Sequence, residues 1–263
     1  MMPSLISIGS FSLSSFGLFV WLAFVAAAFV FWRACRDKGV EDVVIFDNFI
    51  LLTIVFLIGA RLGYVVNHWS TFSDALLKII VIWRYPGLSA WGGMIAALIF
   101  FGLRAQQKKI PSVIFFDSLG YTTVVVLFLL SIAVFLDGTV VGKHTNLPWG
   151  LPSVGVAGDR HPVALYTAII AFLGGIVLAL VRHHFSGKAP KGAIGWLGLY
   201  IVGLAQLPLA FLRDDLVYWG GIAVDVLLTI VLIVVSLIAV LIVFEIPQTL
   251  GNFIESRIKK TPR

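Results

Sequence analysis

IAVDVLLTIVLIVVSLIAVLIVF, which occupies residues 222–244, carries one charged side chain in 23 positions. A bilayer core is about 30 Å thick, and a helix needs about 20 mainly apolar residues to cross it. Lipid offers no water to backbone N–H and C=O groups, so an apolar run of this length must be helical. We therefore predict that residues 222–244 form a transmembrane helix.

Six further segments have similar length and apolar character, and composition agrees with them. Of the 263 residues, 60% are hydrophobic and 12% are charged. No soluble globular domain needs that much apolar surface. We predict an all-α, polytopic integral membrane protein of about seven transmembrane helices, with residues 1–263 in one transmembrane domain. The six further segments are 13–32, 45–66, 87–103, 113–136, 163–181 and 194–212.

The distribution of Lys and Arg predicts the orientation. With seven spans, one side receives 13 of the 19 basic residues, the other receives five, and Arg61 lies within a span. Basic loops mark the cytoplasmic side, so we expect the N-terminus outside and the C-terminus, with a basic tail at 247–263, in the cytoplasm. The segment 87–103 is short and contains Gly92 and Gly93, but omitting it would move whole basic loops across the membrane. The net charge of +6 fits contact with anionic headgroups better than nucleic-acid binding, because no basic domain lies outside the membrane.

Arg61 is the basic residue that lies within a predicted span. An Arg in a span is costly unless it is paired or reaches the interface, and its guanidinium can hold phosphate oxygens with two donors. The alternative is that it extends to the headgroups from a position near the helix end. Gly59 and Gly63 flank it at a spacing that lets a neighbouring helix approach closely. We favour a buried, partnered Arg61.

Residues 137–162 form the predicted outer loop region, and they are rich in Gly and Pro, which indicates turns. Long loops in compact proteins are usually functional or disordered. Lys143, Arg160 and His161 could form a cationic collar for a lipid phosphate, or they could merely contact headgroups.

The other polar residues give weaker signals. Asp47 and Asp117 fall at the inner starts of predicted helices, where the partial positive charge of a helix N-terminus favours a carboxylate. Asp225 could pair with Arg213 or cap its own helix. Cys35 is the single cysteine, so no intrachain disulfide can form, and the sequence shows no cluster of metal-ligand type.

Several different short motifs are spread along nearly the whole chain. They are Ile8-Gly9-Ser10-Phe11-Ser12-Leu13, Gly17, Gly59-Ala60-Arg61-Leu62-Gly63-Tyr64, Leu88-Ser89, Gly92-Gly93, Lys109-Ile110-Pro111, Asp117, Asp137-Gly138, Gly142, Leu147-Pro148-Trp149-Gly150, Arg160-His161-Pro162, Leu165-Tyr166 and Phe211-Leu212-Arg213.

In their order, spacing and seven-span layout, these motifs resemble the bacterial prolipoprotein diacylglyceryl transferase family. The resemblance implies a protein of the bacterial cytoplasmic membrane. Such a protein moves diacylglyceryl from phosphatidylglycerol to the cysteine thiol of a lipoprotein precursor and releases glycerol 1-phosphate. It implies anionic phospholipid and lipoprotein precursors as partners, and no metal or soluble cofactor. We select as candidate lipid-binding residues Arg61, Tyr64, Asp137, Gly138, Arg160 and His161, and we assign no catalytic residue.

The chain departs from the family pattern where the chemistry is expected. The signature resembling G-R-I-G-N-F-x-N-G-E falls on residues 130–139, LSIAVFLDGT, and residues 113–136 contain no Arg, Lys or His. Removing one donor to a developing anion typically costs ~10²–10³ in rate. In this alignment Ser131 stands where the family has its phosphate-binding Arg, Val134 where it has Asn, and Thr139 where it has Glu. Trp91 replaces the family's His, and Phe16 replaces its early Tyr. Gln206 and Ala210 replace its late Arg and Glu.

Two functions therefore stay open. The chain could be a divergent transferase that uses Arg61, Arg160 and His161 in place of the replaced groups. It could instead be a catalytically silent relative that holds lipid or a lipoprotein partner as a scaffold, which the substituted residues favour. A channel or transporter is disfavoured, because the spans contain too few polar residues to line a path.

Overall fold

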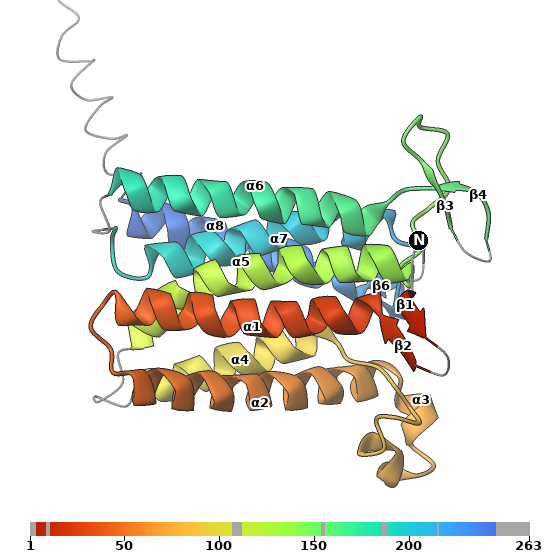
Figure 1. Cartoon of the computed structure of the whole chain (residues 1–263), viewed down its shortest axis with the longest axis horizontal. Coiled ribbons are helices and arrows are strands. Elements are labelled where there is room, and N and C mark those ends of the chain that lie inside the picture. Colours follow the sequence, from red (N-terminus) through yellow and green to blue (C-terminus); the bar gives the residue numbers. More distant parts are fainter. Residues whose placement is uncertain are drawn as a thin grey trace, which may run out of the picture.

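Seven helices lie side by side in a bundle (Figure 1). The computed structural model describes residues 4–8, 11–106, 112–153, 156–185, 189–214 and 216–245, and the predicted basic tail 247–263 lies outside them. The seven bundle helices are α1 (Ser15–Arg36), α2 (Asp42–Asn67), α4 (Ala90–Ala105), α5 (Ser112–Asp137), α6 (Val163–His184), α7 (Ala193–Leu212) and α8 (Val224–Val243).

Six of these helices are long and apolar enough to cross a membrane, which confirms a multi-pass, all-α membrane protein. The exception is α4, whose 16 residues extend about 24 Å at 1.5 Å per residue. That length is less than the hydrocarbon core of about 30 Å. The predicted segment 87–103 is thus a helix, but it begins only at Ala90 because Ser89 caps it, accepting a hydrogen bond from the Gly92 amide at 3.3 Å.

Short elements gather at one end of the bundle (Figure 1). The pattern of the sequence did not predict them, because each is at most five residues long. Three antiparallel hairpins form there, together with a short helix and a 3-10 turn. These elements are β1 (Ser4–Ile8), β2 (Phe11–Ser14), β3 (Leu151–Ser153), β4 (Val156–Arg160), β5 (Tyr218–Trp219), β6 (Ile222–Ala223), α3 (Trp69–Phe72) and η1 (Leu76–Ile79).

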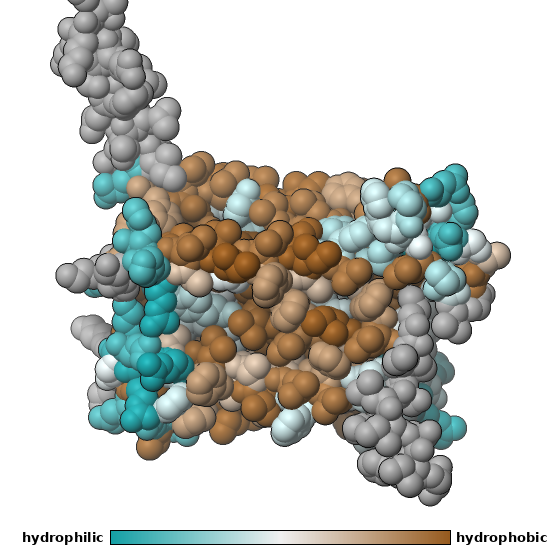
Figure 2. Space-filling model, turned by 45° about the horizontal axis from the view of Figure 1, so that its top comes forward, coloured by the Kyte–Doolittle hydropathy of each residue, from teal (hydrophilic) through white to brown (hydrophobic). Residues whose placement is uncertain are grey.

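We call this the hairpin end, and the opposite end of the bundle the basic end. Arg33 and Arg36 lie in the last turn of α1, Arg104 in that of α4 and Arg182 in that of α6. Figure 2 shows a broad apolar surface between hydrophilic ends. Lipid must cover that surface, because large apolar side chains are exposed along α1, α2, α6 and α8. By the distribution of basic residues, the basic end remains the predicted cytoplasmic end.

Helix α5 is the centre of the bundle and packs on α1, α6 and α7. The close contacts depend on glycine. A Cβ on Gly59 would lie 2.7 Å from the carbonyl oxygen of Gly92, and one on Gly63 would lie 2.7 Å from the Cα of Gly92. The prediction that Gly59 and Gly63 admit a neighbouring helix is therefore confirmed, and that neighbour is α4.

Candidate functional site

The predicted outer loop region crosses the hairpin end between α5 and α6. Helix α5 ends at Asp137, and Gly138 turns the chain with a φ of +75°, a conformation that favours glycine. The chain then runs beside the end of α7, where Gly142 pairs with Arg213 and the Lys143 amide donates to the carbonyl of Leu212 at 2.7 Å. Two segments that are distant in sequence thus meet at this point.

The hairpin of β3 and β4 fixes the next part of the region. Leu151 pairs with Arg160 across the two strands, and His144 forms an isolated bridge with Arg160. The amide of His161 donates to the carbonyl of Lys143 at 3.1 Å. Backbone pairing on both sides therefore places Arg160 and His161 just before α6, with Pro162 at its N-cap.

Arg160 is held by a carboxylate and also has an unused donor. Its side chain is 17% exposed, and its Nη1 lies 3.0 Å from Oδ2 of Asp214. Its Nε is buried and has no hydrogen-bond partner among the described residues. One face of the guanidinium is thus neutralised, and its Nε–H remains available to an acceptor.

His161 belongs to a short chain of polar aromatic groups. Its Nδ1 lies 3.4 Å from the hydroxyl of Tyr166, and the same hydroxyl accepts a hydrogen bond from Nε1 of Trp149 at 2.9 Å. The Tyr166 hydroxyl has a second lone pair, so it can also accept from Nδ1–H of His161. In that tautomer Nε2 of His161 is unprotonated and can accept a hydrogen bond.

Arg160 and His161 line one small pocket at this end. Its volume is about 10 Å³, which is about what one water molecule needs. The hydroxyl of Ser153, which also lines it, is buried without a partner in the described part of the chain, as is Nε of Arg160. Two donors therefore share a cavity that has room for a single oxygen atom. The remaining lining comes from Val134, Phe135, Gly138, Val140, Gly142, Leu151, Pro162, Val163 and Ala164.

The structure brings only part of the predicted set together. Gly138, Arg160 and His161 line the pocket, and Asp137 ends the helix beside it, whereas Lys143 of the predicted collar is exposed and does not line it. Asp214 and Ser153 were not predicted. Asp214 could have been noticed, because it is an acidic residue directly after the motif that ends at Arg213. Nothing in the sequence pointed to Ser153.

Arg61 and Tyr64 lie in a different place and do not line the pocket. Arg61 is 5% exposed, so the prediction of a buried, partnered Arg is confirmed and the headgroup alternative is wrong. Its Nε donates to Ile79, its Nη1 to Tyr85 and Gly87, and its Nη2 to Lys78, all through carbonyl oxygens at 2.8–3.0 Å. These bonds engage four of the five guanidinium N–H donors.

Arg61 thereby organises the segment between α2 and α4. Its guanidinium lies 5.1 Å from the ring of Phe72, and Tyr64 stacks on His68 at 4.1 Å between ring centroids. While these four bonds hold, Arg61 has one N–H donor left for a lipid phosphate. The lipid-binding role of Arg61 and Tyr64 stays a prediction.

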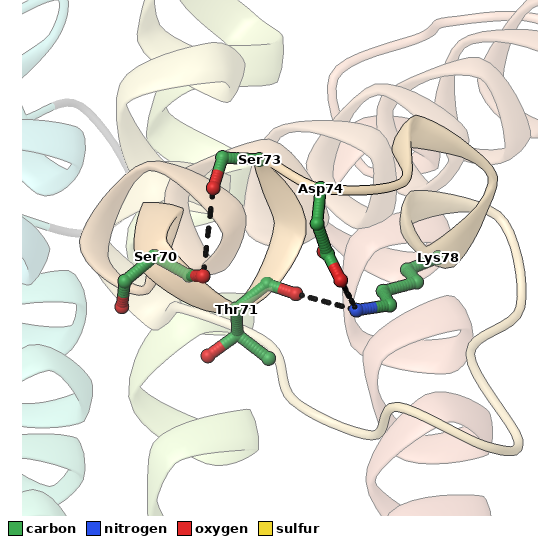
Figure 3. Close-up of polar contacts among 5 residues, drawn as sticks. All are labelled: Ser70, Thr71, Ser73, Asp74 and Lys78. Carbon is green, nitrogen blue, oxygen red and sulfur yellow. Dashed lines mark hydrogen bonds and ion pairs between the residues drawn. The ribbon is translucent and has the colours of Figure 1, made fainter.

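The same segment carries a local ion pair at the surface (Figure 3). Nζ of Lys78 donates to both carboxylate oxygens of Asp74, at 2.7 and 2.6 Å, and to the carbonyl of Thr71 at 3.2 Å. The hydrogen bond from Lys78 lowers the pKa of Asp74 below its ordinary value.

Two predicted carboxylates have partners that the sequence did not specify. Asp117 serves a helix N-terminus, but it is that of α7: its two oxygens accept from the amides of Gly192 and Gly195 at 3.0 and 2.9 Å. Asp225 lies in the first turn of α8 with its Oδ2 3.8 Å from Nη1 of Arg213, so the pairing with Arg213 is confirmed, whereas the N-cap of α8 is Ala223.

Three of the positions that depart from the family signature are filled by compact side chains. Ser131 on α5 and Ala210 on α7 are buried, and Val134 lines the pocket. Among the residues that the structure describes, no group of three or more His, Cys, Asp or Glu is placed to hold a metal ion. Any anion bound here would therefore meet Arg160 and His161 first.

Comparisons with known proteins agree with one another. The family model described as prolipoprotein diacylglyceryl transferase matches residues 3–242. Three similar proteins each bear the name phosphatidylglycerol–prolipoprotein diacylglyceryl transferase. That of Geobacter sulfurreducens is 28% identical over 81% of this chain and 82% of its own length. That of Finegoldia magna is 27% identical over 85% and 88%, and that of Tropheryma whipplei strain TW08/27 is 33% identical over 63% and 64%.

Proposed function

Because the chain belongs to the prolipoprotein diacylglyceryl transferase family, we propose that it transfers diacylglyceryl from phosphatidylglycerol to prolipoproteins at the hairpin end of the bundle. The names of its relatives supply this donor and this acceptor. The predicted orientation puts the hairpin end outside the bacterial cytoplasmic membrane.

The observation that carries the proposal is that four family-like motifs meet at and beside one pocket. Gly138, Gly142 and Arg160-His161-Pro162 line it, and the motif Phe211-Leu212-Arg213 of α7 pairs with the backbone of Gly142 and Lys143 beside it. A scaffold that merely spans the membrane would not need to bring a cation, an imidazole and an unused donor to one cavity.

The reaction assigns a role to each group. The acceptor thiolate attacks the glyceryl carbon of the lipid, a C–S bond forms, and the C–O bond to phosphate breaks, so that glycerol phosphate leaves with the electron pair. Arg160 would stabilise the negative charge of that phosphate. His161 would take the thiol proton, with Tyr166 holding its ring.

Arg160 must first exchange partners. Its ion pair with Asp214 is partly exposed, since the Asp214 side chain is 53% exposed, and such pairs contribute about 1 kcal/mol or less. A phosphate could therefore displace Asp214 at small cost. The pocket must also widen, because about 10 Å³ does not admit a headgroup.

The alternative function is a catalytically silent relative that binds lipid or a lipoprotein partner as a scaffold. It rests on the substitutions in the sequence, such as Ser131 and Ala210 at positions of the family signature. The missing Arg in α5 alone would lower the rate by ~10²–10³ relative to a family member with the full signature.

One experiment separates the two functions. The protein is reconstituted in liposomes with phosphatidylglycerol and a lipobox peptide, and thioether product and released glycerol phosphate are both measured. The transferase proposal expects slow turnover. We expect Arg160→Gln to lower it by at least ~10², because a charged donor to the leaving group is lost.

The matched variants assign the roles. His161→Ala should abolish turnover, whereas Lys143→Ala should leave it unchanged, because Lys143 is exposed and lies outside the pocket lining. If the wild-type protein gives no thioether product, and cells depleted of their own transferase are not rescued by it, the transferase proposal is refuted.

A further inference from the structure

A second cavity lies at the basic end, in a groove between α1 and α6 with α5 as its floor. Its volume is about 250 Å³. The groove is open to its surroundings, since Phe29 on one wall is 60% exposed. It is lined by Phe29, Val30, Arg33, Ala34, Tyr121, Val125, Gly175, Leu178 and Arg182.

Gly175 leaves space open on the α6 wall of the groove. A Cβ on Gly175 would have one neighbouring atom within 4 Å, Cγ1 of Val124, at 3.8 Å, which is ordinary contact. The adjacent Gly174 differs, because a Cβ there would collide with Ile201 of α7. The close packing of α6 on α7 therefore requires glycine at position 174 but does not require it at position 175.

The mouth of the groove is cationic. Arg33 and Arg182 share one carboxylate: Nε of Arg33 lies 3.3 Å from Oδ1 of Asp37, and Nη2 of Arg182 lies 2.7 Å from Oδ2. Two guanidinium groups with one carboxylate leave a net positive charge. The guanidinium of Arg182 also lies 5.9 Å from the ring of Tyr121, which lines the groove below it.

We propose that this groove binds an anionic phospholipid from the leaflet at the basic end. One acyl chain would lie against Val30, Val125 and Leu178, and the phosphate would contact the guanidinium donors of Arg33 and Arg182 that Asp37 does not engage. Guanidinium groups suit phosphate because they present paired donors in one plane. The positive charge at the mouth of the groove favours an anionic headgroup, and the apolar walls below it favour an acyl chain.

The size of the groove fits part of a lipid. Pockets that enclose a whole drug-sized ligand measure about 300–1,000 Å³, so about 250 Å³ open on one side fits a segment of one chain. The groove lies at the opposite end of α6 from Arg160, and the inference does not depend on the proposed transferase function.

The test measures lipid retained by the purified protein. The full chain is reconstituted into vesicles of phosphatidylcholine with one-tenth phosphatidylglycerol or one-tenth cardiolipin, extracted in detergent, and examined by native mass spectrometry. We expect anionic lipid to remain bound in preference to phosphatidylcholine. The two vesicle compositions show which phosphodiester headgroup is preferred.

Two variants test the two parts of the site. Gly175→Leu should fill the groove, and the double variant Arg33→Gln/Arg182→Gln should remove the headgroup contacts; each should lower occupancy about tenfold or more. Gly102→Leu is the matched control for the first, because Gly102 on α4 has open space around it. Arg104→Gln is the control for the second, since Arg104 lies at the same end but outside the groove.

The outcomes are distinct. Unchanged retention in Gly175→Leu or in the double Arg variant would overturn the proposal, as would equal retention of phosphatidylcholine. If Gly175→Leu does not yield monodisperse protein, Gly175→Ser and the double Arg variant decide. The effects of Gly175→Leu and of the double Arg variant should persist in an Arg160→Gln background, which removes the phosphate contact at the hairpin end, so failure of the transferase proposal cannot be mistaken for failure of this one.

Discussion

Replacing Arg61 with Ala should release the segment between α2 and α4. The substitution removes four hydrogen bonds to the carbonyls of Lys78, Ile79, Tyr85 and Gly87. Bonds from charged donors contribute about 1.5–3 kcal/mol each, but carbonyls in an opened surface segment regain water, so we use about 1 kcal/mol each. The loss is then about 4 kcal/mol, and the opening equilibrium of the segment rises about 10³-fold.

Amide hydrogen exchange measures this opening directly. The Lys78 amide donates to Ala75 at 3.0 Å, and the Ser89 amide donates to the carbonyl of Ala60 at 2.8 Å. Both amides should exchange about 10³-fold faster in Arg61→Ala while amides in α5 and α7 keep their protection. Arg61→Lys should fall between, because an ammonium keeps the charge but cannot reach four acceptors in one plane.

Lys78→Ala is the matched control. It removes the surface contacts to Asp74 and Thr71 and keeps the carbonyl of residue 78 that Arg61 binds. Exposed ion pairs contribute little, so exchange at Ser89 should stay within about threefold of wild type. An increase of less than about tenfold at Ser89 in Arg61→Ala would refute the reasoning, because the segment would then be held by its other contacts.

Three further predictions follow from other contacts. Gly92→Leu should collapse the yield of monodisperse protein, because its Cβ would enter the backbone of α2 and overpacking costs about 1–3 kcal/mol or more, whereas Gly102→Leu should purify normally. Asp117→Ala should lower thermal stability in detergent by about 1–3 kcal/mol for each amide it orphans, and Asp117→Asn should lose less, because one acceptor remains. The lowered pKa of Asp74 means that its ion pair stabilises the folded segment above the unfolded pKa and is lost as pH falls through the folded pKa. The protection of amides 71–78, taken relative to their intrinsic exchange rates at each pH, should therefore fall below about pH 4, and Asp74→Asn should remove that dependence.

The long helices could be predicted from sequence because bilayer thickness imposes a length on every apolar span. Residues 113–136 and 163–181 became α5 and α6 with ends shifted by at most a few residues. The hairpins and the short turn at η1 were missed, because two to five residues carry too little periodicity. Residues 222–223, taken as part of the last span, form β6 instead.

The candidate site was predicted less completely, for a physical reason. Arg160 and His161 were found because they are adjacent in sequence and unusual near a membrane. Their partner Asp214 lies 54 residues away and was not found. The carbonyl partners of Arg61 could not have been found either, since every residue has a carbonyl and composition gives no signal for one.

The hydrogen bonds of Asp117 on α5 to the start of α7 constrain the order in which the bundle can assemble during synthesis. The amides of Gly192 and Gly195, which donate to Asp117, are synthesised 75 and 78 residues later. At about 5–20 residues per second, that interval is about 4–15 s. Until then the carboxylate has to remain hydrated at the membrane surface, because an unpaired charge in lipid is costly. The packing of α5 is therefore complete only after α7 has been made. A ribosome that stalls between them would leave the first helices inserted in the membrane without the hydrogen bonds that join α5 to α7.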